Sequence, residues 1–163
     1  MIERYKSVVD NDIKIADWTD NVHYGLYKNQ IDGTLAAAAL FCPEIVRVKD
    51  YVFIKMFLNN YHSDNELLGF VEELEKRYDY SKKKIEMEVN TWSLEDFFIN
   101  DNSVINDDLK KTFGQMLRYF WQIWLLTLFP EKAFVVELGN ELMGEYGECI
   151  TVYKKEEQTC HAL

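Results

Sequence analysis

The sequence predicts an α+β fold, with a largely antiparallel sheet of four to five strands and one long apolar helix packed on it. Three observations predict this class. Apolar residues recur at helical spacing between Leu109 and Leu128. Residues 85–90 alternate apolar and polar side chains, which is typical of a half-buried strand with an acidic outer face. Two strand-like runs, 133–138 and 149–153, flank a segment with three glycines, which favours a hairpin.

Shorter elements are predicted upstream. Thr34 can cap an Ala-rich helix from Leu35 to Phe41. Two runs rich in β-branched and aromatic residues are predicted strands: Ile45–Val48 and Tyr51–Leu58. Ser63 then begins the pattern Ser-Asp-Asn-Glu, a capping box that predicts a helix over about residues 64–79.

The most apolar segment, Tyr119 to Pro130, is predicted to fill a core rather than to enter a membrane. A bilayer span needs roughly 20 apolar residues, whereas this run is shorter, contains Gln122 and follows Arg118. Asn106 can cap the helix, with two aspartates in the first turn where the helix dipole favours acids. We therefore expect a core helix that begins amphipathic, becomes apolar on most sides and ends at Pro130.

Length and composition bound the class of protein. The chain has 163 residues, 48% of them hydrophobic, which is enough apolar material for the core of one domain. Its 18 basic and 28 acidic residues give a net charge of −10, which disfavours direct binding to nucleic acid and favours basic partners. Three irregularly spaced cysteines and an N-terminus without an apolar signal segment predict a cytoplasmic protein.

The two ends of the chain are weakly patterned. Residues 1–30 give no clear element, although Trp18 and Tyr24 indicate that this segment packs somewhere. Residues 156–163, with Cys160, are expected to fray. The other two cysteines, Cys42 and Cys149, are expected to be buried as small apolar side chains.

Most catalytic signatures are missing from the sequence. It contains no Gly-x-x-x-x-Gly-Lys loop, no Gly-x-Gly-x-x-Gly and no Gly-x-Ser-x-Gly. His62, Ser63 and Asp64 are the residue types of a catalytic triad, but adjacent residues rarely give its geometry. Cys160 and His161 supply two metal ligands at most. We expect no enzyme activity, no cofactor and no metal, although the many carboxylates leave a hydrolase open.

Acidic side chains fall in two windows without a basic residue, 85–109 and 133–153. Most charge runs are solvated faces, but two such windows in one domain can form a negative patch that steers a basic partner. Aromatic residues are enriched at interface hot spots, so Tyr146 is a candidate anchor, whereas Trp92 is expected to pack in the core. The candidate partner-binding residues are Glu86, Glu88, Glu95, Asp96, Glu141, Glu145, Tyr146 and Glu148.

The order of segments over roughly residues 35–155 follows a familiar pattern. It consists of Leu40–Glu44, Val52–Ile54, a helix with Trp121 and Trp124, its end at Leu128–Pro130, and strands at Phe134–Val136 and Ile150–Tyr153. This pattern resembles a group of small bacterial immunity proteins that accompany polymorphic toxins, including those of contact-dependent growth inhibition.

The resemblance implies a cytoplasmic protein without catalysis that binds the C-terminal domain of a cognate toxin, often a nuclease. Such proteins cover the toxin's active site or a nearby surface. Nuclease domains tend to be basic because they bind phosphates, so an acidic inhibitor suits them. The alternatives are a non-catalytic adaptor for another basic partner and a small hydrolase; neither a membrane nor nucleic acid is an expected partner.

Overall fold

The computed structural model describes residues 31–98 and 106–155 and has an α+β fold, as the sequence predicts. Its helices are α2 (Ile31–Phe41), α3 (Asp64–Arg77), α4 (Lys82–Asn90) and α5 (Asp107–Leu128). Its strands are β1 (Ile45–Val48), β2 (Tyr51–Ile54), β3 (Trp92–Ser93), β4 (Phe134–Asn140) and β5 (Glu148–Lys154). Short 3-10 turns are η1 (Lys55–Leu58), η2 (Glu95–Phe98) and η4 (Leu142–Gly144).

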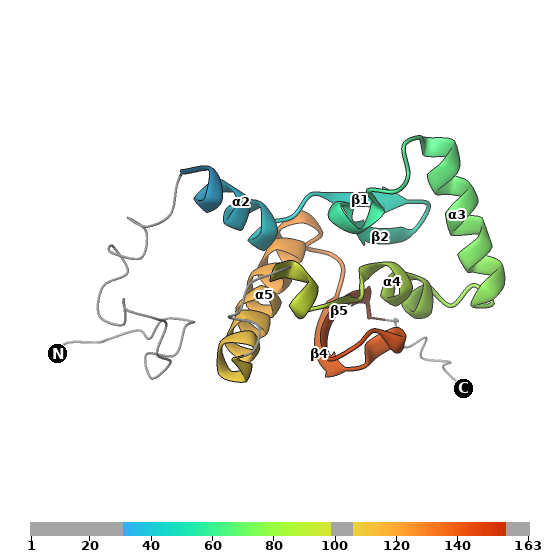
Figure 1. Ribbon diagram of the computed structural model, residues 1–163. Helices are drawn as coiled ribbons and strands as arrows, with labels where there is room; N and C mark the ends of the chain where they lie inside the picture. Colours follow the sequence, from blue (N-terminus) through green and yellow to red (C-terminus); the bar gives the residue numbers. More distant parts are fainter. Residues whose placement is uncertain (1–30, 99–105, 156–163) are drawn as a thin grey trace, which may run out of the picture.

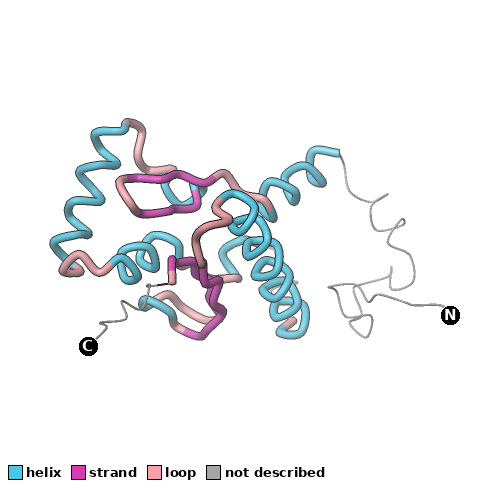
Figure 2. Tube along the Cα trace, turned by 180° about the vertical axis from the view of Figure 1, so that it is seen from behind, coloured by secondary structure: helices cyan, strands magenta, loops and turns pink. Residues whose placement is uncertain are grey.

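The strands pair in antiparallel fashion but form two sheets rather than one. β1 and β2 make a two-stranded hairpin, and the second sheet has the order β3-β5-β4. Figure 1 shows α4 lying between the two sheets, with α3 beyond the β1–β2 hairpin and α5 beside β4 and β5. Seen from behind, α4 again separates the hairpin from the other sheet, and α2 extends away from both (Figure 2).

Two apolar clusters lie on opposite sides of β2. Val52 and Ile54 face a cluster with Leu117, Trp121 and Leu125 of α5. The alternate residues of β2 face a second cluster, built with α3 and α4, whose buried members are Val48, Tyr51, Phe53, Leu58, Val71, Leu74, Ile85 and Val89. Since successive strand residues point to opposite faces, this short strand joins the two halves of the core.

The long helix is capped as predicted. The side chain of Asn106 accepts hydrogen bonds from the backbone N–H groups of Asp108 and Leu109, each at 3.1 Å. The helix ends at Leu128, two residues before Pro130. None of the helices within the described ranges is long and apolar enough to cross a bilayer.

The helix α5 contributes to the core, as predicted, but through one side only. One stripe is buried and includes Leu117, Trp121 and Leu125. The opposite face leaves Tyr119 at 48% and Leu126 at 57% exposure. The helix therefore stays amphipathic in packing, although the sequence of its outer face is apolar.

The strand predicted at 85–90 is wrong: these residues belong to α4. Ile85 and Val89 are four residues apart, so the same apolar residues that alternate in sequence also share one helix face. Ser81 caps the helix by accepting a hydrogen bond from the N–H of Lys84 at 3.5 Å. The predicted acidic outer face is also absent, because the side chain of Glu86 is fully buried.

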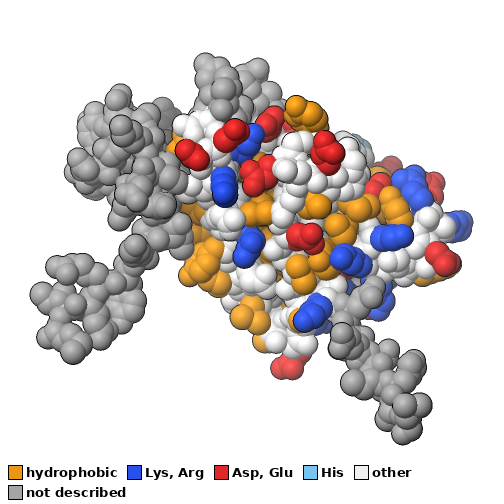
Figure 3. Space-filling view, turned by 90° about the horizontal axis from the view of Figure 1, so that it is seen from below, with side chains coloured by type: hydrophobic (Ala, Val, Ile, Leu, Met, Phe, Trp, Pro, Cys, Tyr) orange, Lys and Arg blue, Asp and Glu red, His pale blue; other side chains and the backbone are white. Residues whose placement is uncertain are grey.

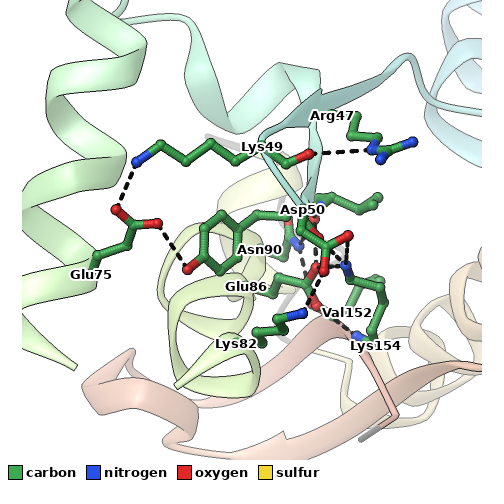
Figure 4. A network of polar contacts seen from close by, with 11 residues as sticks. Arg47, Lys49, Asp50, Glu75, Lys82, Glu86, Asn90, Val152 and Lys154 are labelled. Carbon is green, nitrogen blue, oxygen red and sulfur yellow. Dashed lines mark hydrogen bonds and ion pairs between the residues drawn. The ribbon is translucent and has the colours of Figure 1, made fainter. Parts of the chain in front are cut away.

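Glu86 and Asn90 of α4 replace the backbone partners that β2 and β5 would otherwise give each other (Figure 4). The Glu86 carboxylate accepts from the N–H of Val52 at 2.9 Å and of Lys154 at 2.6 Å. The Asn90 side chain accepts from the N–H of Ile54 at 2.9 Å and donates to two carbonyls, one in β2 and one in β5. α4 therefore acts as a polar wedge between the two sheets.

Other boundaries differ by a few residues. Thr34 lies inside α2, which begins at Ile31, so the predicted cap at Thr34 is wrong. β2 ends at Ile54 and a 3-10 turn follows, whereas the sequence predicts a strand to Leu58. Ser63 caps α3 as predicted, accepting from the N–H of Glu66 at 3.3 Å.

Of the two cysteines predicted to be buried, Cys149 is buried and Cys42 is exposed. The predictions for residues 1–30 and 156–163 lie outside the described residues.

Candidate protein-binding surface

The β4–β5 hairpin holds an acidic tip in a defined shape. The strands pair from Phe134 with Lys154 to Asn140 with Glu148. At the tip, the N–H of Glu141 donates to the carbonyl of Gly147 at 2.9 Å. Gly147 has φ +75°, a left-handed conformation that favours glycine. The backbone of the tip is thus fixed by the ladder and by this closing bond.

Strand β3 brings the first acidic window against this tip. Ser93 pairs with Cys149, and the N–H of Leu94 donates to the carbonyl of Glu148 at 2.8 Å. A Cβ on Gly147 would stand 3.8 Å from the Oε1 atom of Glu95, which places that carboxylate directly beside the turn. The two windows, far apart in sequence, therefore meet at one place.

We call this place the acidic hairpin surface and define it as Glu95, Asp96, Glu141, Glu145, Tyr146 and Glu148. Asp96, Glu141 and Glu145 are exposed, and within the described chain no ion pair neutralises them. Glu95 differs, because its carboxylate lies 2.7 Å from the Nζ atom of Lys110. Figure 3 shows one face of the molecule, on which acidic side chains, in red, lie among Lys and Arg side chains, in blue, and apolar surface, in orange.

Two other candidates do not join this surface. Glu86 is fully buried in the wedge between the sheets, so the prediction that it meets a partner is wrong. Glu88 lies on α4, where its carboxylate accepts from the Tyr78 hydroxyl at 2.7 Å and pairs with Arg77 at 3.4 Å. Both carboxylates serve contacts within the chain.

The two aromatic candidates are both accessible. Tyr146 is 78% exposed at the hairpin tip. Trp92 was expected to pack in the core, but it is 37% exposed, so that prediction is wrong. Its ring stacks on Phe57 with centroids 5.0 Å apart and planes at 13°. One face of the indole is therefore packed against Phe57.

One thiol, that of Cys149, lies next to this surface, in β5. The Cys149 thiol is buried against backbone carbonyls, 3.4 Å from that of Gly147, and burial raises its pKa, which disfavours a reactive thiolate. Across residues 31–98 and 106–155 no group of three or more His, Cys, Asp or Glu side chains could hold a metal ion. What the surface offers is negative charge and exposed aromatic rings.

Two features of this region escaped the sequence analysis. One is β3, which at two residues is too short to give a periodic pattern. The other is the partner of Glu95: Lys110 lies on α5, 15 residues away, and no local pattern links them.

The residues behind the resemblance to immunity proteins have clear packing roles. The indole N–H of Trp121 donates to the carbonyl of Leu40 at 2.8 Å, and that of Trp124 to Pro43 at 2.9 Å. They attach the last turn of α2 and the segment that follows it to the long helix. No protein-family model, no curated protein and no solved structure matches this chain. The resemblance therefore stays a prediction.

Proposed function

We propose that this chain is a non-catalytic cytoplasmic protein that binds a basic protein domain through the acidic hairpin surface. Following the resemblance to immunity proteins, we propose that the bound domain is a toxin and that binding neutralises it. The observation that supports the proposal is the convergence of Glu95 and Asp96 with the tip of the β4–β5 hairpin. The free thiols of Cys42 and Cys149 are compatible with a reducing compartment.

Charge supports a basic partner. The chain has a net charge of −10, and three carboxylates of the surface have no basic neighbour among the described residues to neutralise them. Such a field attracts a positively charged domain and speeds productive encounter. A nucleic-acid-cleaving toxin domain would present the complementary surface, since it binds phosphate backbones.

Aromatic side chains supply contacts that charge alone does not. Interface hot spots are enriched in Trp and Tyr, because large rigid rings bury much area at low entropic cost. Tyr146 lies among Glu141, Glu145 and Glu148 in the hairpin, and Trp92 pairs with Ile150 on the neighbouring strand. We expect Tyr146 to be the main anchor, because it is the more exposed of the two rings.

The rigidity of the tip also favours binding. Ordering a loop on association costs free energy that a preformed loop avoids. The bond from Glu141 to Gly147, the turn η4 and the full register of β4 with β5 hold the tip before a partner arrives.

A charge-reversal experiment tests the proposal. The partner is a catalytically inactive copy of a candidate toxin domain, sought among the genes next to that of this chain, and affinity is measured by calorimetry. Reversing Glu141, Glu145 and Glu148 to Lys should weaken binding at least about tenfold, because attraction becomes repulsion.

The matched control reverses three carboxylates away from the hairpin: Glu44→Lys, Glu72→Lys and Glu73→Lys. It changes the net charge by the same amount and should leave affinity nearly unchanged. Equal losses in both triple variants would show that net charge acts without a defined surface. Undiminished binding by the hairpin variant would remove this surface from the proposal.

A further inference from the structure

An open groove of about 720 Å³ lies at the end of the β4–β5 hairpin opposite its acidic tip. Among the described residues, its charged lining consists of Lys82, Lys132, Lys154 and Lys155 with Asp50 and Glu131. We call it the lysine groove. A local excess of basic charge in a chain of net charge −10 needs an explanation.

Two of the lysines form ion pairs within the fold. Lys82 and Lys154 both pair with the carboxylate of Asp50 (Figure 4). The Nζ atom of Lys154 also lies 3.6 Å from the buried Glu86 carboxylate, and its side chain is 13% exposed. These contacts fasten the β1–β2 turn to α4 and β5.

The other two lysines have no such role. Lys132, from the loop between α5 and β4, has its Nζ atom 5.9 Å from the Phe129 ring. Lys155 is exposed, and its backbone N–H donates to the carbonyl of Ala133 at 2.8 Å. Within the described chain neither ammonium group has a carboxylate partner. Both therefore line the groove with charge that the fold does not use.

Further groups in the groove suit an anion. Ser81 and Tyr80, which both carry a hydroxyl group, are among its lining residues, and Tyr80 is 63% exposed. Ser81 is the N-cap of α4, so the positive end of that helix dipole lies at the groove. The first turn of α4 carries Lys82, Lys83 and Lys84 and no acid, the reverse of what helix stability favours.

We propose that the lysine groove binds a small anion of two or more charges, with phosphate groups as the recognised chemistry. Lysines bind phosphate as point charges, and the groove's volume lies in the range of small-molecule sites. Lys132 and Lys155 supply the new contacts, while Asp50 competes with the ligand for Lys82 and Lys154. The site lies at the end of the hairpin away from the acidic tip and does not depend on the proposed toxin binding.

Calorimetry on the full chain at low ionic strength tests the proposal, with pyrophosphate as the probe. The wild-type chain should bind one pyrophosphate, and the double variant Lys132→Ala/Lys155→Ala should bind at least about tenfold more weakly. The control Lys76→Ala/Lys111→Ala, which removes two exposed lysines elsewhere, should retain the wild-type affinity.

A second pair of variants tests the competition. Asp50→Asn should tighten pyrophosphate binding several-fold, whereas Asp108→Asn, which changes the net charge equally, should not. Citrate serves as the carboxylate comparison and should bind more weakly than pyrophosphate. No binding by the wild-type chain, equal losses in both lysine variants, or tighter binding of citrate would each overturn the proposal.

Discussion

The polar wedge of α4 and the acidic hairpin surface use the same residue type in opposite ways. In the wedge, the Glu86 carboxylate is fully buried and accepts two backbone N–H bonds. At the hairpin, Glu145 is exposed and has no ion-pair partner in the described chain. The role of each carboxylate depends on its surroundings. Glu86 faces the unpaired edges of two strands, whereas Glu145 faces solvent.

This difference separates residues that specify the fold from residues available to a partner. The edges of β2 and β5 that face α4 would expose unpaired N–H and C=O groups, which are costly to bury. Glu86 and Asn90 satisfy them from one helix face. Throughout the described residues no buried side-chain nitrogen or oxygen is left without a hydrogen-bond partner. The hairpin carboxylates satisfy nothing comparable.

The largest expected effect is on the wedge. Glu86→Leu leaves the N–H groups of Val52 and Lys154 without acceptors and removes a charge beside Lys154. We expect the free energy of unfolding to fall by about 3–5 kcal/mol, measured by urea denaturation. Glu88→Leu, two residues along the same helix, should cost far less, because its contacts are closer to solvent. Similar losses in both variants would contradict the wedge role.

A smaller effect is expected at the hairpin tip, and on binding rather than stability. Tyr146→Ala should weaken the complex with the inactive toxin domain by about 1–2 kcal/mol, since exposed tyrosines are frequent hot spots. The variant Tyr146→Phe, which keeps the ring and removes the hydroxyl, should retain most of the affinity. If the Ala variant binds like the wild type, Tyr146 is not an anchor.

Acid titration should give opposite slopes for two buried carboxylates. Burial raises the pKa of Glu86 above its ordinary value of 4.5, so its contribution to stability is complete below pH 4.5 and declines as pH rises through its folded pKa. The hydrogen bond from Lys49 lowers the pKa of Glu75, so its contribution is present above pH 4.5 and is lost as pH falls through its folded pKa.

Denaturation of the wild type, Glu86→Gln and Glu75→Gln as a function of pH checks this. Relative to Glu86→Gln, the wild type should lose stability as pH rises above 4.5. Relative to Glu75→Gln, it should lose stability as pH falls below 4.5. Slopes of the same sign would contradict the assignment of burial to one carboxylate and pairing to the other.

The smallest effect is expected for exposed members of the hairpin surface. Glu145→Gln should change the free energy of unfolding by less than about 0.5 kcal/mol, because the side chain makes no ion pair with the described residues. Chemical denaturation beside the wild type is sufficient. A loss comparable to that of a wedge variant would mean that the hairpin carboxylates stabilise the fold.

Local chemistry made much of the fold predictable. The caps at Ser63 and Asn106 were predicted because the residue that accepts the hydrogen bond lies within three positions of its donors. The β4–β5 hairpin was predicted because its glycines separate two runs of strand-forming residues. Both are properties of neighbouring residues.

The failures come from contacts between distant segments. The spacing of the apolar residues in 85–90 fits both a strand and a helix. The helix forms because Glu86 and Asn90 then bond to the backbones of β2 and β5. The split of the strands into two sheets follows from the same wedge. At the candidate surface, the residue types were predictable, but their meeting depends on β3, a two-residue strand.

Hydrogen–deuterium exchange on the complex tests the central claim most directly. The chain is measured alone and in the presence of the inactive domain of a candidate toxin. Binding at the acidic hairpin surface predicts slower exchange over residues 141–148 and 93–96, with α3 unchanged. Slower exchange over α3 with an unchanged hairpin would place the interface elsewhere and contradict the account.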